Sequence, residues 1–364
     1  MKLTAQVKLL ATHEQLALLK QTMETANAAC NAISHRAWQN KEFQQYRLHK
    51  LTYHEIRAAF RLTAQVVVRC IARVAAAYKL DRKTRRVFKS GGAIPYDDRI
   101  LRWYVGRAEV SIWTVNGRQR IPFVCGERQR RLLAARQGET DLIYHRGEFY
   151  LAATCNVEEP EPTDVDDVLG VDFGVVNIAV DSDGEVHAGN QVNNVRHRHR
   201  RLRAKLQRKG TKAARRRLKK LAGKECRFAK HTNHVISKHI VAKAQGTRRA
   251  IAIEDLKGIR ERVTARRQQR ATLHSWAFSQ LRQHTTYKAA LAGVPLVLID
   301  PRNTSRTCPA CGYVDKRNRP NQSTFSCVKC GFAGPADHIA AMNIRVLGRG
   351  VVNRPYVSDA QNAA

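Results

Sequence analysis

A single carboxylate stands inside an apolar run. Asp172 lies between two short apolar segments, residues 168–171 and 175–180, and a glycine flanks it on each side, at positions 170 and 174. Such segments indicate buried strands, and a buried carboxylate is costly unless it is paired, hydrogen-bonded or bound to a metal. The glycines leave room for another group to approach the backbone. Asp172 is therefore either a functional acid or, more simply, an Asp that caps a turn or pairs with a buried arginine.

The charge of the chain points to a polyanionic partner. A formal net charge of +35 over 364 residues exceeds what solubility requires, and nucleic acid is the usual partner of such an excess. An anionic membrane is the competing partner, but we find neither an apolar span of transmembrane length nor an acylation signal. The sequence begins without a hydrophobic signal region, so a cytoplasmic, nucleoid-associated location in a prokaryote is expected.

The first part of the chain changes its hydrophobic period twice. Alternation near residues 3–10 predicts a strand, and helical spacing follows, with one helix expected to reach residue 40, one to begin at Thr52 and one to span 64–80. From residue 105 the period is two, and Asn116-Gly117 and Arg146-Gly147 predict hairpin turns. We expect a small β-barrel, residues 1–11 and 91–162, that carries inserted helices, residues 12–90. The Pro- and Glu-rich residues 158–162 indicate a linker.

The most basic segment, residues 196–230, contains a single acidic residue, Glu225. The few apolar residues in this segment recur at helical spacing, which predicts two helices, one on each side of Gly210. Like charges at this density repel one another, so we expect a phosphate backbone to lie against them; the simpler interpretation is a solvated face. The candidate contacts here are Arg201, Arg208, Arg215, Arg216 and Lys219, and those in the amino-terminal helices are Tyr53, Arg57 and Arg73.

Four of the nine cysteines form two pairs. Cys308 and Cys311 are separated by two residues, as are Cys327 and Cys330, and fifteen residues lie between the pairs. This is the spacing of a zinc ribbon with four thiolate ligands. Because the cysteines fill the coordination sphere, the zinc is expected to be structural. The alternative, a redox pair, does not account for the second pair.

Two further acids stand at the ends of predicted elements and could act together with Asp172. Glu254 ends a short apolar strand, and Asp337 opens a late amphipathic helix, where the simpler interpretation is a helix cap. Acids in these positions are how an RNase H-like fold gathers ligands for two magnesium ions. Asp255 and Asp300 are the nearest alternatives, but Asp255 is expected to point to the opposite face of its strand.

These motifs resemble the TnpB family of transposon-encoded proteins, which are related to type V CRISPR effectors. The resemblance rests on residues 170–174 (GVDFG), 253–256 (IEDL), 303–312 (NTSRTCPACG), 327–331 (CVKCG) and 336–344 (ADHIAAMNI), and it extends over nearly the whole chain. It implies an α/β multidomain architecture: a wedge barrel with an inserted helical recognition region, and an RNase H-like RuvC domain, residues 163–305 and 336–364, interrupted by a zinc ribbon, residues 306–335. His338 and Ile339 depart from the usual third motif, although its acid is present.

The resemblance implies an RNA-guided DNA endonuclease. A guide RNA would pair with double-stranded target DNA beside a short motif that the protein reads, and one RuvC site would cut both strands. Asp172, Glu254 and Asp337 would be the catalytic acids and would hold Mg²⁺ or Mn²⁺. Two alternatives are a guided repressor that no longer cuts and an RNase H-like transposase that works without RNA. No membrane partner is expected, and a monomer is favoured.

Overall fold

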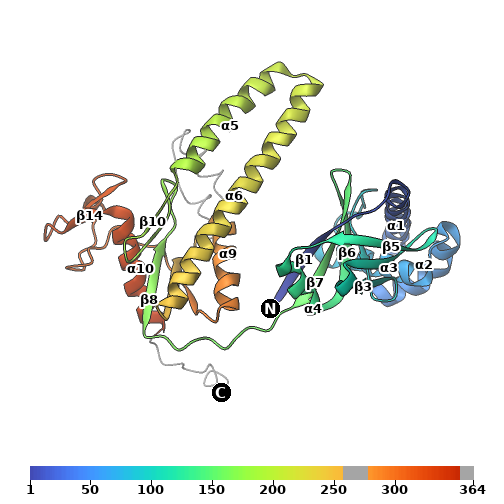
Figure 1. Ribbon diagram of the computed structural model, residues 1–364, viewed down its shortest axis with the longest axis horizontal. Coiled ribbons are helices and arrows are strands. Elements are labelled where there is room, and N and C mark those ends of the chain that lie inside the picture. The colour runs from blue at the N-terminus through green and yellow to red at the C-terminus, as the bar shows by residue number, and fades with distance from the viewer. Residues whose placement is uncertain (257–277, 353–364) are drawn as a thin grey trace. The chain divides into compact units, whose positions relative to one another are not determined.

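The computed structural model describes residues 1–256 and 278–352. The chain divides into two compact units, Met1–Glu158 and Glu159–Ala364, which are described separately (Figure 1). In the described ranges, no helix is long and apolar enough to cross a membrane.

The first unit contains a seven-stranded sheet in the order β2-β6-β7-β1-β5-β4-β3, which curls into a nearly closed barrel. Every paired neighbour is antiparallel, and β1 pairs along most of its length with β7. The strands are β1 (Lys2–Leu9), β2 (Ile94–Tyr96), β3 (Leu101–Tyr104), β4 (Glu109–Thr114), β5 (Gly117–Val124), β6 (Arg136–His145) and β7 (Glu148–Asn156). Two short helices, η1 (Val105–Arg107) and α4 (Glu127–Ala134), join them.

Both expected hairpins form, but the turn residues were predicted correctly in only one of them. Arg146 and Gly147 have φ of 55° and 90°, as a two-residue turn of the mirror-image type requires. In the other hairpin Thr114 pairs with Gly117, so the turn residues are Val115 and Asn116, one position earlier than expected.

Three helices pack on the barrel core: α1 (His13–Gln39), α2 (Gln45–Phe60) and α3 (Ala64–Leu80). Thr12 closes a capping box with Gln15 at the start of α1. The expected start of α2 at Thr52 is wrong, because the helix begins seven residues earlier. Thr52 is buried inside it, and its hydroxyl donates to the backbone oxygen of Leu48 at 2.8 Å.

The second unit is built on a five-stranded sheet in the order β10-β9-β8-β11-β12. β8, β11 and β12 are parallel, and β9 and β10 are antiparallel to their neighbours. The strands are β8 (Asp167–Asp172), β9 (Asn177–Asp181), β10 (Val186–Ala188), β11 (Arg249–Glu254) and β12 (Leu296–Ile299). The register pairs Val171 with Ile253, so β8 and β11 end side by side.

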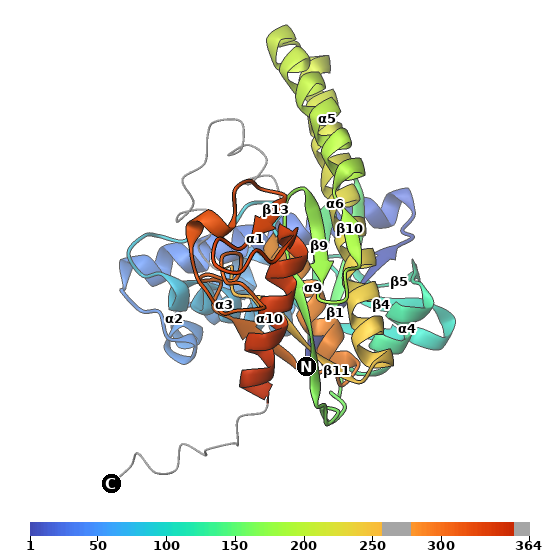
Figure 2. The same ribbon diagram turned by 90° about the vertical axis from the view of Figure 1, so that its left-hand side faces the viewer.

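Helices cover both faces of this sheet. α6 (Lys212–Gly246) and α9 (Phe278–Leu291) pack against one face, and α10 (Ala336–Val352) packs against the other. α5 (Asn190–Lys209) and α6 form a long hairpin that extends beyond the sheet (Figures 1 and 2). α10 crosses β8 so closely that a Cβ on Gly170 would lie 2.2 Å from the backbone oxygen of Ala341. The group that approaches this glycine is therefore a helix of the same chain.

A small cysteine-containing subdomain separates β12 from α10. It contains η2 (Lys316–Asn318) and a two-stranded sheet, β13 (Thr324–Ser326) and β14 (Ala333–Pro335). Asn318 is fully buried at its centre: its amide donates to the backbone oxygens of Arg306 and Tyr313 and accepts from the backbone of Val328. Asn343 of α10 donates to the backbone oxygens of Thr304 and Thr307 at 2.7 and 2.8 Å, which holds the start of the subdomain against the helix that follows it.

Candidate metal centres

The structure brings the three expected acids to one end of the sheet, on the face that α10 covers. Asp172 is the last residue of β8, Glu254 is the last residue of β11, and Asp337 lies in the first turn of α10. Since β8 and β11 are parallel neighbours, their carboxyl ends meet at the same edge. Alternation along each strand places Asp172 and Glu254 on the face of Val168 and Ala252, which pack toward α10.

The acids repel one another. Burial, followed by the negative charges of Glu254 and Asp337, raises the pKa of Asp172 to about 8. Burial also raises the pKa of Glu254, although a 2.6 Å hydrogen bond from the Thr304 hydroxyl to its Oε1 opposes the rise. Buried carboxyl groups that raise one another's pKa are typical of an acidic site that binds a cation.

Two neighbours of Asp337 have direct contacts with it. The Asn177 side-chain amide donates to Oδ2 at 2.9 Å, and the Arg319 guanidinium lies 3.5 Å from Oδ1. The charge of Arg319 also opposes the rise in the pKa of Asp172 and Glu254. Neither neighbour was expected, and nothing in the sequence distinguishes Arg319 from the other arginines of a basic chain.

The three acids do not form a single compact group of ligand atoms. Their nearest oxygens are not all within 4.8 Å of one another, unlike the two groups of ligands described below. A single ion about 2.1 Å from each ligand could not be shared by all three without side-chain movement. The all-oxygen donor set fits magnesium or manganese.

The two alternative acids lie outside this cluster. Asp255 turns away from Glu254 and accepts a 2.5 Å hydrogen bond from Arg282 of α9. Asp300 is exposed and accepts from the backbone of Arg302 within its own loop.

The four cysteines converge as their spacing predicts. Their Sγ atoms all lie within 4.8 Å of one another, and the pairs Cys308–Cys330 and Cys311–Cys327 are each separated by 3.6 Å. Tetrahedral thiolates about 2.3 Å from zinc would be about 3.8 Å apart, so the arrangement fits a zinc ion with little adjustment.

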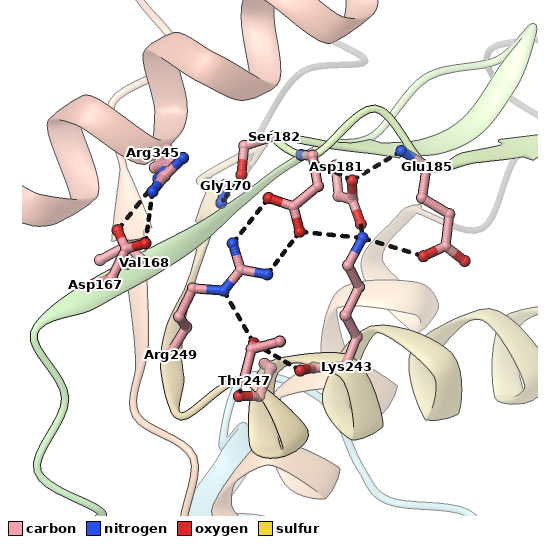
Figure 3. A network of polar contacts seen from close by, with 12 residues as sticks. Asp167, Val168, Gly170, Asp181, Ser182, Glu185, Lys243, Thr247, Arg249 and Arg345 are labelled. Carbon is pink, nitrogen blue, oxygen red and sulfur yellow. Dashed lines mark hydrogen bonds and ion pairs between the residues drawn. The ribbon is translucent and has the colours of Figure 1, made fainter.

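A network of ion pairs joins the β9–β10 turn to α6 and β11 (Figure 3). Arg249 makes a two-pronged contact with Asp183 at 2.8 and 2.6 Å, which lowers the pKa of that acid. Lys243 contacts Asp181, and it lies 3.2 Å from both Asp183 and Glu185. Nothing in the linear sequence indicates this network, because its members come from three separate elements.

The predicted nucleic-acid contacts differ in exposure. The five on the hairpin are exposed, namely Arg201, Arg208, Arg215, Arg216 and Lys219. In the first unit Arg57 is exposed, whereas Tyr53 is partly buried and stacks on His49. Arg73 is also partly buried: its guanidinium donates to Oδ1 of Asn27 at 2.9 Å and covers the ring of Phe88.

Two family models match the chain, both largely within the second unit. The model described as "Probable transposase" (OrfB_IS605) matches residues 152–259, and the model described as "Cas12f1-like, TNB domain" matches residues 278–344. The first range includes Asp172 and Glu254, and the second includes Asp337 and all four paired cysteines.

Curated relatives carry corresponding names. The chain is 38% identical over 133 residues to the CRISPR-associated endodeoxyribonuclease Cas12f1 of Sulfoacidibacillus thermotolerans, covering 35% of this chain and 29% of that protein. It is 32% identical over 128 residues to the TnpB-like protein MJ0751 of Methanocaldococcus jannaschii, covering 35% and 45%. The matches therefore span less than half of each of these relatives.

A solved structure shares the fold. The cryo-EM structure of a Cas12f1–sgRNA–target DNA complex matches with a TM-score of 0.62 and 15% identity, covering 92% of this chain and 83% of that one. The fold and its acidic and cysteine clusters define an α/β protein with two candidate metal centres. The resemblance to the TnpB family is confirmed: the chain is related to TnpB-like and Cas12f1 proteins.

Proposed function

We propose that this protein is an RNA-guided DNA endonuclease whose acidic centre hydrolyses the phosphodiesters of both target strands. The observation that carries the proposal is the meeting of Asp172, Glu254 and Asp337 at one end of the sheet, where burial and then the negative charges of the other two acids raise the pKa of Asp172 to about 8. A buried cluster of carboxylates of this kind supports the binding of cations, and the related proteins that carry the name endodeoxyribonuclease support the reaction class.

The chain's own residues have distinct roles in this proposal. Asp172, Glu254 and Asp337 would hold the divalent ions, with Asp172 as the ligand that two ions would share and the other two acids each serving one ion. Thr304 orients Glu254, and Asn177 orients Asp337, through the hydrogen bonds described above. Divalent ions bound by these acids would supply an activated water and stabilise the leaving oxygen. Because the pKa of Asp172 is raised, this acid would have to give up its proton to serve as a metal ligand.

The remaining parts would serve recognition. The exposed basic residues of α5 and α6 hold the phosphate backbone of a guide RNA or an RNA–DNA duplex. The barrel, residues 1–11 and 91–162, and the helices within residues 12–90 act as wedge and recognition region. Residues 163–305 and 336–364 form the RuvC domain, of which residues 257–277 and 353–364 lie outside the described parts. The cysteine subdomain, residues 306–335, is a structural zinc ribbon.

The test is co-expression of the protein with its genomic locus, followed by sequencing of bound RNA and a plasmid-library cleavage assay in magnesium. We expect a defined RNA and guide-matched cleavage that Asp172→Ala abolishes and Asp300→Asn retains, because Asp300 is an exposed acid outside the cluster. Bound RNA with DNA binding but no cleavage would indicate a guided repressor. Absence of RNA would overturn the guided mechanism and favour a transposase.

A further inference from the structure

A second group of metal-ligating side chains lies apart from the acidic and cysteine centres. Glu185, His187 and His239 bring one carboxylate oxygen and two imidazole nitrogens within 4.8 Å of one another. His187 belongs to β10, Glu185 directly precedes that strand, and His239 belongs to α6. The ligands therefore join an edge of the sheet to the second helix of the basic hairpin, where β10 and α6 lie next to each other (Figure 2).

The local backbone explains why the side chains converge. Glu185 and His187 are two positions apart, so extended backbone directs both to the same side. Val186, between them, points the other way and lines a cavity of about 580 Å³ that also borders Asn177 and Asp337. The rings of His187 and His239 have centroids 6.0 Å apart and are inclined by 52°, so they are not stacked face to face.

The two oxygens of Glu185 have different neighbours. Oε1 lies 3.8 Å from Nε2 of His187, whereas Oε2 lies 3.2 Å from the Lys243 ammonium. Lys243 follows His239 by four residues, one turn along the same side of α6. It also contacts Asp181 (Figure 3) and lies 3.2 Å from Asp183. Oε1 can therefore ligate a cation while Oε2 keeps its contact with the Lys243 ammonium, so the positive charge of Lys243 remains paired.

We propose that Glu185, His187 and His239 bind a divalent transition ion of the zinc class, with water in the remaining position. Two imidazoles and one carboxylate form a donor set that zinc, cobalt and nickel accept, whereas magnesium and calcium prefer oxygen ligands alone. Ligand atoms around a tetrahedral zinc are about 3.4 Å apart, so small side-chain rotations close the site. The bound ion links the base of the basic hairpin to the sheet edge, independently of the proposed nuclease reaction.

The test uses the full-length chain with Asp172→Asn, which weakens the acidic centre, loaded with one equivalent of zinc so that the four cysteine thiolates are occupied and the Glu185–His187–His239 group is left for cobalt. Titration with Co²⁺ is expected to give a saturable visible absorption band of four- or five-coordinate cobalt without thiolate charge-transfer bands. Adding His187→Ala or His239→Ala is expected to weaken cobalt binding at least about 10-fold, since even outer partners of metal ligands cause losses of that size. His231→Ala is the matched control, an exposed histidine on the same helix.

A second variant gives a positive signal. With His239→Cys, a new cobalt–thiolate charge-transfer band is expected, because the introduced sulfur would ligate the ion directly. The proposal is overturned if no visible band forms, if the band survives both alanine substitutions, or if His231→Ala removes it equally. An ordinary His187–Glu185 ion pair predicts the first of these outcomes.

Discussion

The Arg319 guanidinium lies 3.5 Å from Oδ1 of Asp337, so a residue from between the two cysteine pairs reaches the acid in the first turn of α10. The same cation opposes the rise in the pKa of Asp172 and of Glu254. The cysteine subdomain therefore contributes a positive charge to the acidic centre, and that charge partly offsets the repulsion among the three carboxylates.

Replacing Arg319 with Gln should destabilise the second unit in magnesium-free buffer. If the ion pair between Arg319 and Asp337 contributes about 1 kcal/mol to the free energy of unfolding, its loss lowers the thermal midpoint of this unit by about 2–4 °C, measured by calorimetry. Saturating Mg²⁺ should close the difference, because bound ions replace the lost charge. Arg317→Gln is the control, since Arg317 pairs with Asp315 instead. Equal, magnesium-insensitive shifts in both variants would contradict this role.

Thr304→Val removes the hydroxyl that donates to Glu254. Without that hydrogen bond the carboxylate is harder to ionise and less well oriented, so the Mg²⁺ concentration for half-maximal cleavage should rise about 10-fold. Thr307→Val provides the comparison, because its hydroxyl donates to the backbone of Asn303. A normal magnesium requirement in Thr304→Val would show that the hydrogen bond does not support ion binding.

Asp172→Asn should alter the pH dependence of stability. The pKa of Asp172 is about 8 in the folded chain and near 3.8 ordinarily, so between these pH values the folded state holds a proton that the unfolded state lacks. Stability from this group is therefore highest at low pH and falls as pH rises through that window. In magnesium-free buffer, the free energy of unfolding of the variant minus that of the wild type should increase by at most about 1.4 kcal/mol for each unit that the pH rises. A difference that is constant with pH in denaturant unfolding would refute the raised pKa.

Cys311→Ser should release the zinc of the cysteine subdomain, as measured by elemental analysis after dialysis. Cleavage should fall as well, because the subdomain supplies Arg319 and leads directly into α10. Cys226→Ser, at an exposed cysteine of α6, should retain both properties. Full cleavage by a zinc-free Cys311→Ser protein would separate the subdomain from the reaction.

Replacing Arg215 and Arg216 with Gln should weaken RNA binding and reduce its salt dependence. Loss of two phosphate contacts lowers the slope of log affinity against log salt by about 1.5. Filter binding at several salt concentrations measures this slope. Arg130 and Arg131 of α4, replaced in the same way, remove equal charge elsewhere. If both double variants change the slope equally, the hairpin has no special role.

Much of the second unit could be predicted because its signals are local. The apolar strands ending at Asp172 and Glu254, the helix beginning near Asp337 and the cysteine spacing all depend on short segments, and the structure contains each of them. The start of α2 was predicted wrongly at Thr52, because a threonine suits the start of a helix but also fits a buried mid-helix position where its hydroxyl bonds to the preceding turn.

The contacts around the acids could not be predicted. Asn177, Thr304 and Arg319 reach the centre from a strand, a loop and the cysteine subdomain, and only tertiary packing brings them together. Polar residues of these types are common on solvated surfaces, so none has a distinguishing pattern. Nor does the sequence show that Arg73, one of the candidate nucleic-acid contacts, is partly buried and contacts Asn27 and Phe88 of its own unit.

Asn343 ties the beginning of the cysteine subdomain to the helix that follows its end. By holding the backbone oxygens of Thr304 and Thr307 against α10, it keeps the two ends of the inserted segment together. Because both ends of the inserted segment are held together, the packing of the rest of the sheet domain does not depend on how long the segment is. Subdomains of different size could be exchanged at this junction through evolution or by engineering, provided that the exchanged segment returns a cation to the position of Arg319.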